Sequence, residues 1–235
     1  MLNKERHRLL MGRILRDIYS DISISSLLGF KGGTCAYFFY NLPRFSVGLD
    51  FDLLELNEAK KNIVFKQLET IISQYGEIKD KYIKKNTILF LLSYEKSKYN
   101  IKLEISTRTL KNIKDYYEIR NYLGTAMLIA QKKYLFSAKL AALTLRKKTA
   151  SRDIYDTYYF AKNNWDIDTA FIKEITGQDI NKYLDDCITL VEKIDNKQIM
   201  QGLGELVSEK EKKWVKEKLK PEVIFMLRNY KQALG

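Results

Sequence analysis

The sequence predicts an α+β protein in which strands and helices alternate through the first half and helices alone make up the second. Alternation of apolar and polar residues, typical of strands, is confined to positions before about 106. Beyond about Tyr134, apolar residues recur at helical intervals. The 235 residues are 46% hydrophobic, enough for a substantial core. The halves meet near 125–135, so we expect an α/β domain over 1–130 and a helical C-terminal domain over 131–235.

The first elements have clear start and stop signals. Apolar residues at helical spacing predict a helix from Lys4 to about Tyr19. A short strand and a glycine turn follow over 29–34. A second helix over 35–41 should end before Pro43, since proline cannot continue a helix.

Strand signals then dominate as far as residue 106. Alternation predicts a strand over 49–54, and Asn57 is placed to cap a long helix that runs to about Tyr75. Three further strand candidates cover 80–84, 88–94 and 100–106.

The residue types present restrict the chemistry. His7 is the only histidine, which argues against a Ser-His-Asp triad, a Cys-His pair or a zinc hydrolase. Cys35 and Cys187 lie too far apart in the sequence to indicate a disulfide framework or a thiolate metal site. Catalysis would therefore depend on carboxylates, lysines, arginines and hydroxyls, a set that suits magnesium and phosphate.

The charge points to a polyanionic partner. The net charge is +12, and the stretch 100–149 holds eleven Lys/Arg against three acidic residues, a surplus of +8. A lysine-rich, solvated surface that reflects an AT-rich genome is the alternative. No apolar run reaches the ~20 residues that span a bilayer, and the N-terminus has no apolar signal core. We expect a cytoplasmic protein with no membrane partner.

The segment Lys31-Gly32-Gly33-Thr34 is the first candidate for a functional site. A glycine turn that enters a helix exposes backbone N–H groups at the positive end of that helix, where phosphates bind. A simple tight turn would give the same pattern.

Three acidic residues form the second candidate. Period-two alternation puts Asp50 and Asp52 side by side on one strand face, where their repulsion favours a cation between them. Glu104 lies on a later strand and would add a third oxygen ligand for Mg²⁺ or Mn²⁺. The alternatives are two solvent-facing aspartates on an edge strand and an ordinary surface glutamate.

Taken together, these motifs resemble a known family. The strings GFKGGTCAYFFYNLPRFSVGLDFDLL, IKLEIS and AKLAALTLRKKTASRDIYDTYYF are similar, in this order, to the AbiEii/AbiGii toxin nucleotidyltransferases, which include MenT-type toxins. The match covers about residues 28–160. It implies a DNA polymerase β-like nucleotidyltransferase core, a mixed sheet flanked by helices, followed by an all-helical C-terminal half.

The resemblance also implies roles for individual residues. Nucleotide phosphates would be bound by Gly32, Gly33 and Thr34, with Arg44 and Ser46 nearby. Catalysis and metal binding would involve Asp50, Asp52 and Glu104. Lys139 would contact the triphosphate, and we expect its ammonium to have no partner within the protein. Asp156 would be a further catalytic residue, in an Arg152-Asp153-x-x-Asp156 element whose two aspartates share a helix face.

The resemblance breaks at one position. Family members often have an acid two residues after the serine of Arg-Phe-Ser, where this chain has Gly48. Either the working pair has moved to Asp50 and Asp52, which keeps the strand face, or one ligand has been lost. We prefer the shifted pair.

The implied activity is metal-dependent transfer of a nucleoside monophosphate from an NTP to an acceptor hydroxyl, within a toxin–antitoxin or phage-defence system. The acceptor would be RNA, such as a tRNA 3′ end, with Lys147 and Lys148 in contact with it and a cognate antitoxin as partner. The alternatives are a protein or small-molecule acceptor, and a catalytically weak module that binds nucleotide or RNA.

Overall fold

The computed structural model describes residues 2–95, 98–146, 148–195 and 198–234. The chain forms two compact units. The sheet unit comprises Met1–Asn41 and Phe45–Gln131, and the helical unit comprises Leu42–Arg44 and Lys132–Gly235. Among the described residues, no helix is both long and apolar enough to cross a membrane.

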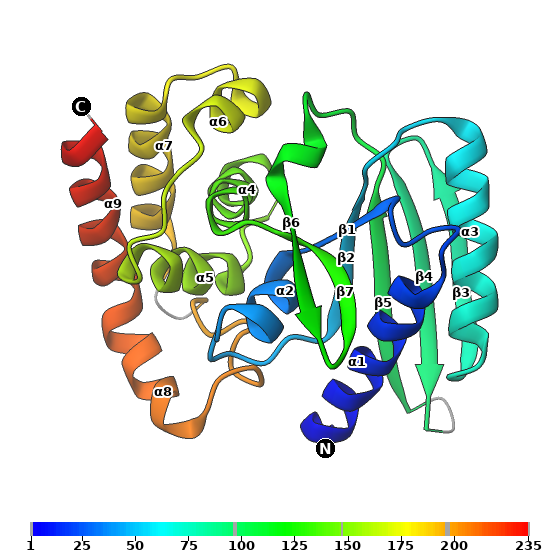
Figure 1. The fold of residues 1–235 in the computed structure, drawn as a ribbon. Coiled ribbons are helices and arrows are strands. Elements are labelled where there is room, and N and C mark those ends of the chain that lie inside the picture. The colour runs from blue at the N-terminus through cyan, green and yellow to red at the C-terminus, as the bar shows by residue number, and fades with distance from the viewer. Residues whose placement is uncertain (1, 96–97, 147, 196–197, 235) are drawn as a thin grey trace. The chain divides into compact units, whose positions relative to one another are not determined.

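The sheet unit is built on a mixed, seven-stranded sheet in the order β3-β4-β5-β2-β1-β7-β6 (Figure 1). Two of its pairings, β2 with β5 and β1 with β7, are parallel, and the others are antiparallel. The strands are β1 (Leu28–Lys31), β2 (Gly48–Leu53), β3 (Glu77–Lys84), β4 (Thr87–Tyr94), β5 (Tyr99–Ser106), β6 (Tyr117–Tyr122) and β7 (Thr125–Ala130).

Helices α1 (Lys4–Ser20), α2 (Gly32–Phe39) and α3 (Glu58–Ser73) pack on the sheet, and a short 3₁₀ helix, η1 (Ile113–Tyr116), precedes β6. Asn3 and Asn57 cap α1 and α3 by accepting hydrogen bonds from backbone N–H groups in the first turn. The alternating apolar residues of the central strands are buried, and Phe90 of β4 contacts Phe65 of α3. The polar residues of β2 and β5 consequently face away from these helices.

The helical unit contains α4 (Lys132–Leu145), α5 (Ser151–Lys162), α6 (Thr169–Thr176), α7 (Ile180–Lys193), α8 (Glu209–Trp214) and α9 (Lys220–Leu234). A π-helical segment, Val215–Leu219, joins α8 to α9. Pro221 follows it and lacks the N–H that a regular helix would use, which favours an irregularity of this kind. Phe160 stacks on Trp165 with ring centroids 4.1 Å apart, and Phe136 packs edge-on against Phe160.

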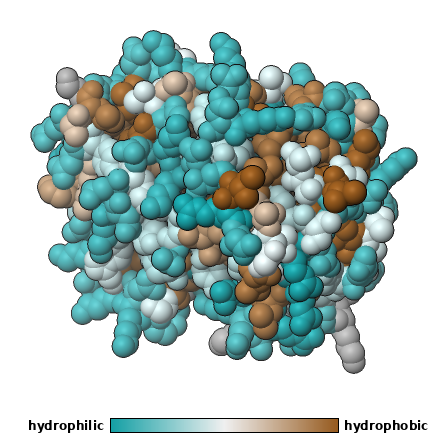
Figure 2. Space-filling model, viewed as in Figure 1, coloured by the Kyte–Doolittle hydropathy of each residue, from teal (hydrophilic) through white to brown (hydrophobic). Residues whose placement is uncertain are grey.

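The fold class predicted from the sequence is confirmed: a mixed sheet with flanking helices, followed by a helical C-terminal region. Every strand and helix predicted before residue 107 is present. The β6–β7 hairpin was not predicted, because its turn residues are Leu123 and Gly124, both with positive φ, and leucine is an unusual residue there. Hydrophobic side chains stand out over β6 and its turn in Figure 2. Ile119 of β6 is 73% exposed, and Leu123 of the turn is 81% exposed.

Candidate functional site

The turn at Gly32 brings the start of α2 against a carboxylate. Gly32 has φ of 79°, a conformation that favours glycine, and it begins α2 directly after β1. A Cβ at this position would lie only 2.6 Å from Asp50 Oδ2. Both the backbone conformation and the close approach of Asp50 therefore require glycine. The result is a helix N-terminus, which attracts anions, next to an acid, which attracts cations.

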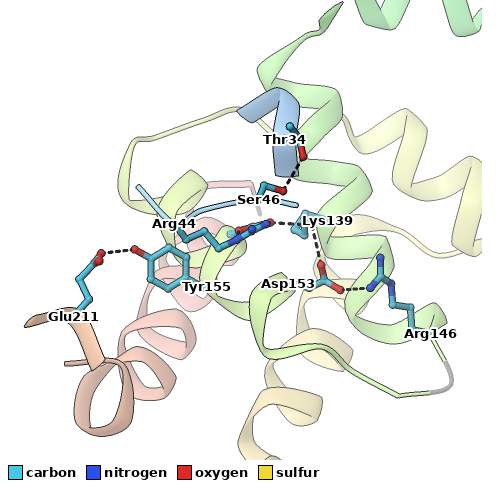
Figure 3. A network of polar contacts seen from close by, with 9 residues as sticks. Thr34, Arg44, Ser46, Lys139, Arg146, Asp153, Tyr155 and Glu211 are labelled. Atoms are coloured by element: carbon cyan, nitrogen blue, oxygen red, sulfur yellow. Dashed lines mark hydrogen bonds and ion pairs between the residues drawn. The ribbon is translucent and has the colours of Figure 1, made fainter. Parts of the chain in front are cut away.

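The hydroxyls of Thr34 and Ser46, which the resemblance assigned to the nucleotide site, lie together and are buried. Thr34 Oγ1 lies 2.8 Å from Ser46 Oγ (Figure 3) and also hydrogen-bonds to the carbonyl of Gly48. Thr34 is fully buried, and Ser46 is 9% exposed. These contacts tie the segment before β2 to helix α2, so the Thr34 hydroxyl is already used within the protein.

Asp50 and Glu104 are neighbours on adjacent strands. They are Cα register partners in the parallel β2–β5 pair, and both are half-buried. Because register partners in a parallel pair point to the same face, their carboxylates share the face opposite to the α1–α3 helices. Glu104 also forms an ion pair with Lys102, two residues earlier on the same strand.

Asp52 has a different environment, which corrects the expectation of two repelling acids. It is 1% exposed; Lys31 Nζ lies 2.5 Å from Oδ1, and Tyr117 Oη donates a hydrogen bond of 2.6 Å to Oδ2. Gly29, the register partner of Asp52, leaves room for the Tyr117 ring, which a Cβ there would overlap. Lys31 thus supplies the positive charge that the sequence analysis assigned to a metal.

These donors fit a magnesium or manganese ion bound largely through substrate. Asp50 and Glu104 offer carboxylate oxygens, which hard divalent cations prefer, and Mg²⁺ is commonly held by one or two carboxylates together with phosphate oxygens and water. Among the described residues, no group of three His, Cys, Asp or Glu could hold a metal by itself. Gly48 adds no ligand, and a Cβ there would lie 3.0 Å from the Lys102 carbonyl oxygen.

The helical unit contains a buried chain of charged residues (Figure 3). Arg44 binds both oxygens of Asp156, at 2.5 and 2.6 Å. Lys139 lies 2.9 Å from Asp156 and 2.8 Å from Asp153, and Arg146 lies 2.9 Å from the other oxygen of Asp153. The two aspartates share one face of α5, as their spacing predicted, and both are fully buried.

This cluster overturns the expectation that the Lys139 ammonium has no partner within the protein. Burial tends to raise the pKa of Asp156, but the charges of Arg44 and Lys139 outweigh it, and the pKa lies below its usual value. Burial likewise tends to lower the pKa of Lys139, and the two aspartates outweigh it, so that pKa is raised. Both groups therefore remain charged, and Lys139 is held by carboxylates.

The basic stretch 100–149 is largely paired. At least six of the cations that the structure describes here form ion pairs with carboxylates: Lys102, Lys114, Arg120, Lys133, Lys139 and Arg146. Several of those carboxylates, such as Glu55 and Asp168, lie outside the stretch, so the surplus of +8 overstates its local charge. Lys148 is exposed and donates a hydrogen bond to Gln201, whereas Lys147 lies outside the described residues.

Sequence reasoning included Lys31 in the glycine-turn segment without assigning it a role, and it missed Tyr117. Lys31 directly precedes the glycine pair, and alternation along a strand that ends there would have placed it on the face of the acids. Tyr117 lies in the hairpin that was not predicted, so no signal was available for it.

Solved structures of two other proteins share the fold of this chain. The structure is similar to that of JHP933 from Helicobacter pylori, with 21% identity, a TM-score of 0.63 and coverage of 100% of this chain and 94% of that one. It is also similar to MenT4, a nucleotidyltransferase toxin of Mycobacterium tuberculosis, with 15% identity, a TM-score of 0.62 and coverage of 98% and 86%. At these identities the likeness establishes the fold. No curated protein sequence matches significantly.

The family assignment comes from the sequence itself. A family model described as "Nucleotidyl transferase AbiEii toxin, Type IV TA system" matches residues 13–225, which is most of the chain. The matched range includes the glycine turn, the β2 and β5 acids and the charged cluster of the helical unit. The chain therefore belongs to the AbiEii family of toxin nucleotidyltransferases.

Proposed function

We propose that this nucleotidyltransferase moves a nucleoside monophosphate from an NTP to an RNA hydroxyl, such as a tRNA 3′ end, with release of pyrophosphate. The observation that carries the proposal is the placement of Asp50: its carboxylate lies against the N-terminus of α2, with Glu104 beside it in register. This brings together donors for phosphate and ligands for a cation, the two requirements of phosphoryl chemistry.

Different residues of the sheet unit would bind the phosphates, hold the metal ion and accept the proton. Backbone N–H groups at the start of α2 bind the phosphates of the NTP and orient them. Asp50 and Glu104 would hold the Mg²⁺ or Mn²⁺ ion, which would neutralise charge on the triphosphate. Glu104 accepts the proton of the acceptor hydroxyl. As the new bond forms between that oxygen and the α-phosphorus, the bond to the β-phosphate oxygen breaks and pyrophosphate leaves.

The remaining assigned residues have supporting roles. Asp52 orients Lys31 and Tyr117 on the same sheet face, and Thr34 and Ser46 fix the segment before β2. The cluster that contains Lys139 and Asp156 is assigned no step in the transfer, because each of these charges is already bound to its neighbours.

The context of the activity follows from the family. Type IV toxin–antitoxin systems include an antitoxin, so a cognate antitoxin is the expected partner. A role in phage defence and a cytoplasmic location are part of the proposal, since a tRNA acceptor is found in the cytoplasm. The net charge of +12 supports a nucleic-acid acceptor over a small molecule.

A labelling experiment tests the proposal. Purified protein is incubated with total RNA and each α-labelled NTP in turn, with Mg²⁺ or with EDTA. We expect labelled RNA in the presence of Mg²⁺ and none in the presence of EDTA. In the Asp50→Asn variant the rate of RNA labelling should fall at least ~100-fold, which is typical of removing a key electrostatic group. Asp80→Asn, the same change at an exposed residue of β3, is the matched control and should label normally.

The outcome also separates the alternatives. Labelled protein or a labelled small molecule in place of RNA would identify a different acceptor. Gly48 stands where family members often have an acid. Its presence favours a second candidate function, a module that binds nucleotide or RNA with little turnover. Binding of NTP without any labelled product would support that candidate. Labelling that persists in EDTA and in Asp50→Asn would refute the site assignment.

A further inference from the structure

One end of the sheet gathers residues that the transfer step does not use. The register places the end of β1, the start of β2, the end of β4 and the start of β5 at the same end of the sheet. The first turns of α1 reach this end through His7, whose Nε2 donates to the Val47 carbonyl at 3.1 Å while Nδ1 accepts from Tyr94 Oη at 2.5 Å. The Gly32 turn and Asp50 lie at this end as well.

A continuous run of aromatic rings crosses this end, and we call it the aromatic ridge. Successive ring centroids are 5.6, 5.7, 5.7, 5.6 and 6.0 Å apart along Phe38, Tyr37, Phe45, His7, Tyr94 and Tyr99. The three inner rings, from Phe45 to Tyr94, are buried and support the others. The three outer rings, Tyr37, Phe38 and Tyr99, are half-buried and present part of their surface to solvent.

Exposed cations alternate with these rings. Lys4 Nζ lies 5.6 Å from the centroid of Phe45, the Arg8 guanidinium 5.7 Å from that of Phe38, and Lys98 Nζ 5.6 Å from that of Tyr99. All three cations are exposed, on α1 and in the turn between β4 and β5. Aromatic faces that alternate with positive charges are the pattern by which proteins hold single-stranded nucleic acid: bases stack on the rings, and phosphates pair with the cations.

We propose that the aromatic ridge, with Lys4, Arg8 and Lys98, binds the single-stranded end of an RNA molecule. The inference rests on the proposed function: the ridge and Asp50 lie at the same end of the sheet, the ridge on the face that α1 and α2 cover and Asp50 on the other face, so a strand held by the ridge would pass around this end to bring its terminal hydroxyl to Asp50. Unpaired bases are favoured over a duplex, since only they expose faces to stack on Tyr37, Phe38 and Tyr99. An acidic protein could also pair with the cations, and competition by polyglutamate distinguishes it from RNA.

The test measures RNA binding without NTP or metal. A fluorescent single-stranded RNA of about 12 nucleotides, within the range of known single-strand sites, is titrated with protein and followed by anisotropy. Two double variants remove one cation and one ring each: Arg8→Ala with Phe38→Leu, and Lys98→Ala with Tyr99→Leu. Leucine preserves most of the buried volume. We expect each to raise Kd by at least ~10-fold, the lower range for loss of one stacking contact and one phosphate contact.

The chain provides a matched control. Lys84 Nζ lies 4.2 Å from the ring centroid of Tyr82, and the register puts this pair at the opposite end of the sheet. Lys84→Ala with Tyr82→Leu therefore removes the same chemistry from a different place and should leave Kd within ~2-fold of the unmodified protein. Thermal melting of every variant shows whether a change in Kd comes from misfolding.

Failure of this inference is separable from failure of the proposed function. The ridge proposal is wrong if its variants, folded as judged by melting, bind RNA like the control. It is also wrong if polyglutamate or a duplex of the same charge competes as well as single-stranded RNA. Asp50→Asn should bind RNA normally. RNA binding at the ridge without any nucleotidyl transfer would overturn the proposed function and leave the ridge intact.

Discussion

At the scale of single residues, His7 makes the stability of the protein depend on pH. It is 1% exposed, and its two ring nitrogens are used by a carbonyl, which can only accept, and by the Tyr94 hydroxyl. Nε2 must therefore carry the proton while Nδ1 accepts. Burial lowers the pKa of His7 below its usual 6.5, and the bond to Val47 offsets only part of this.

The sign of the effect follows from linkage. Well above pH 6.5 the imidazole is neutral in both states, and it contributes no dependence on pH. As the pH falls below that value, the unfolded chain binds a proton that the folded protein does not, so the free energy of unfolding decreases by up to about 1.4 kcal/mol per pH unit. Since His7 is the only histidine, urea denaturation between pH 7 and 5 should report it directly. A His7→Gln variant should show a flat profile, and an unchanged slope in that variant would contradict the assignment.

Asp50 and Asp52 should respond differently to the same substitution. Asp52→Asn weakens the bonds to Lys31 and Tyr117 at a buried position and should lower the free energy of unfolding by about 1–3 kcal/mol. Asp50→Asn should lower the free energy of unfolding less, because Asp50 is half-buried and asparagine keeps the shape of the side chain beside Gly32. Chemical denaturation of the two variants in parallel is the measurement. Equal free energies of unfolding for the two variants would contradict the different roles and would favour the expectation that both acids bind one cation.

At the scale of elements, the buried charges between α4 and α5 predict a large effect for Lys139. Replacing it with methionine leaves Asp153 without one of its two cations and removes a neighbour of Asp156, both fully buried. Breaking a buried ionic network in this way costs about 3–5 kcal/mol. We expect this loss in urea denaturation at neutral pH. It should diminish as the pH falls through the acid range, where Asp156, whose pKa is held below its usual value, becomes protonated.

Lys133 provides the control on the same helix. Its ammonium is exposed and lies 3.7 Å from Asp168, so Lys133→Met should cost far less stability. Comparable losses in the two variants would show that the helix, and not the buried cluster, determines the effect.

The elements also show what the sequence could and could not predict. Local patterns sufficed for α1–α3 and β1–β5, because hydrophobic period and capping residues are properties of short segments. The neighbouring positions of Asp50 and Glu104 followed from placing both on strands of one sheet. The pairing of Asp52 with Tyr117 and that of Lys139 with the α5 aspartates could not be predicted, since pairing across 65 residues or between two helices depends on tertiary packing that no local pattern encodes.

At the scale of the whole molecule, the net charge of +12 predicts binding that depends on salt, in a way that separates the possible acceptors. Three cations of the ridge, Lys4, Arg8 and Lys98, would neutralise about three phosphates, so log K should fall with log salt with a slope of about −2 for single-stranded RNA. Raising salt fourfold, from about 50 to 200 mM, should then weaken RNA binding by about 20-fold.

Variants identify which cations set that slope. Arg8→Ala should reduce the magnitude of the slope by about 0.7, which is the contribution of one phosphate contact to binding of a single strand. The variant makes one phosphate contact fewer, so binding releases fewer counterions from the RNA. Lys148→Ala removes an exposed cation of the helical unit that the sequence analysis assigned to RNA, and it should leave the slope unchanged if the ridge carries the contacts. Fluorescence titrations at four salt concentrations give both values. If only Lys148→Ala changed the slope, the RNA would lie on the helical unit. A slope near zero for the unmodified protein and all variants would favour a protein or small-molecule acceptor.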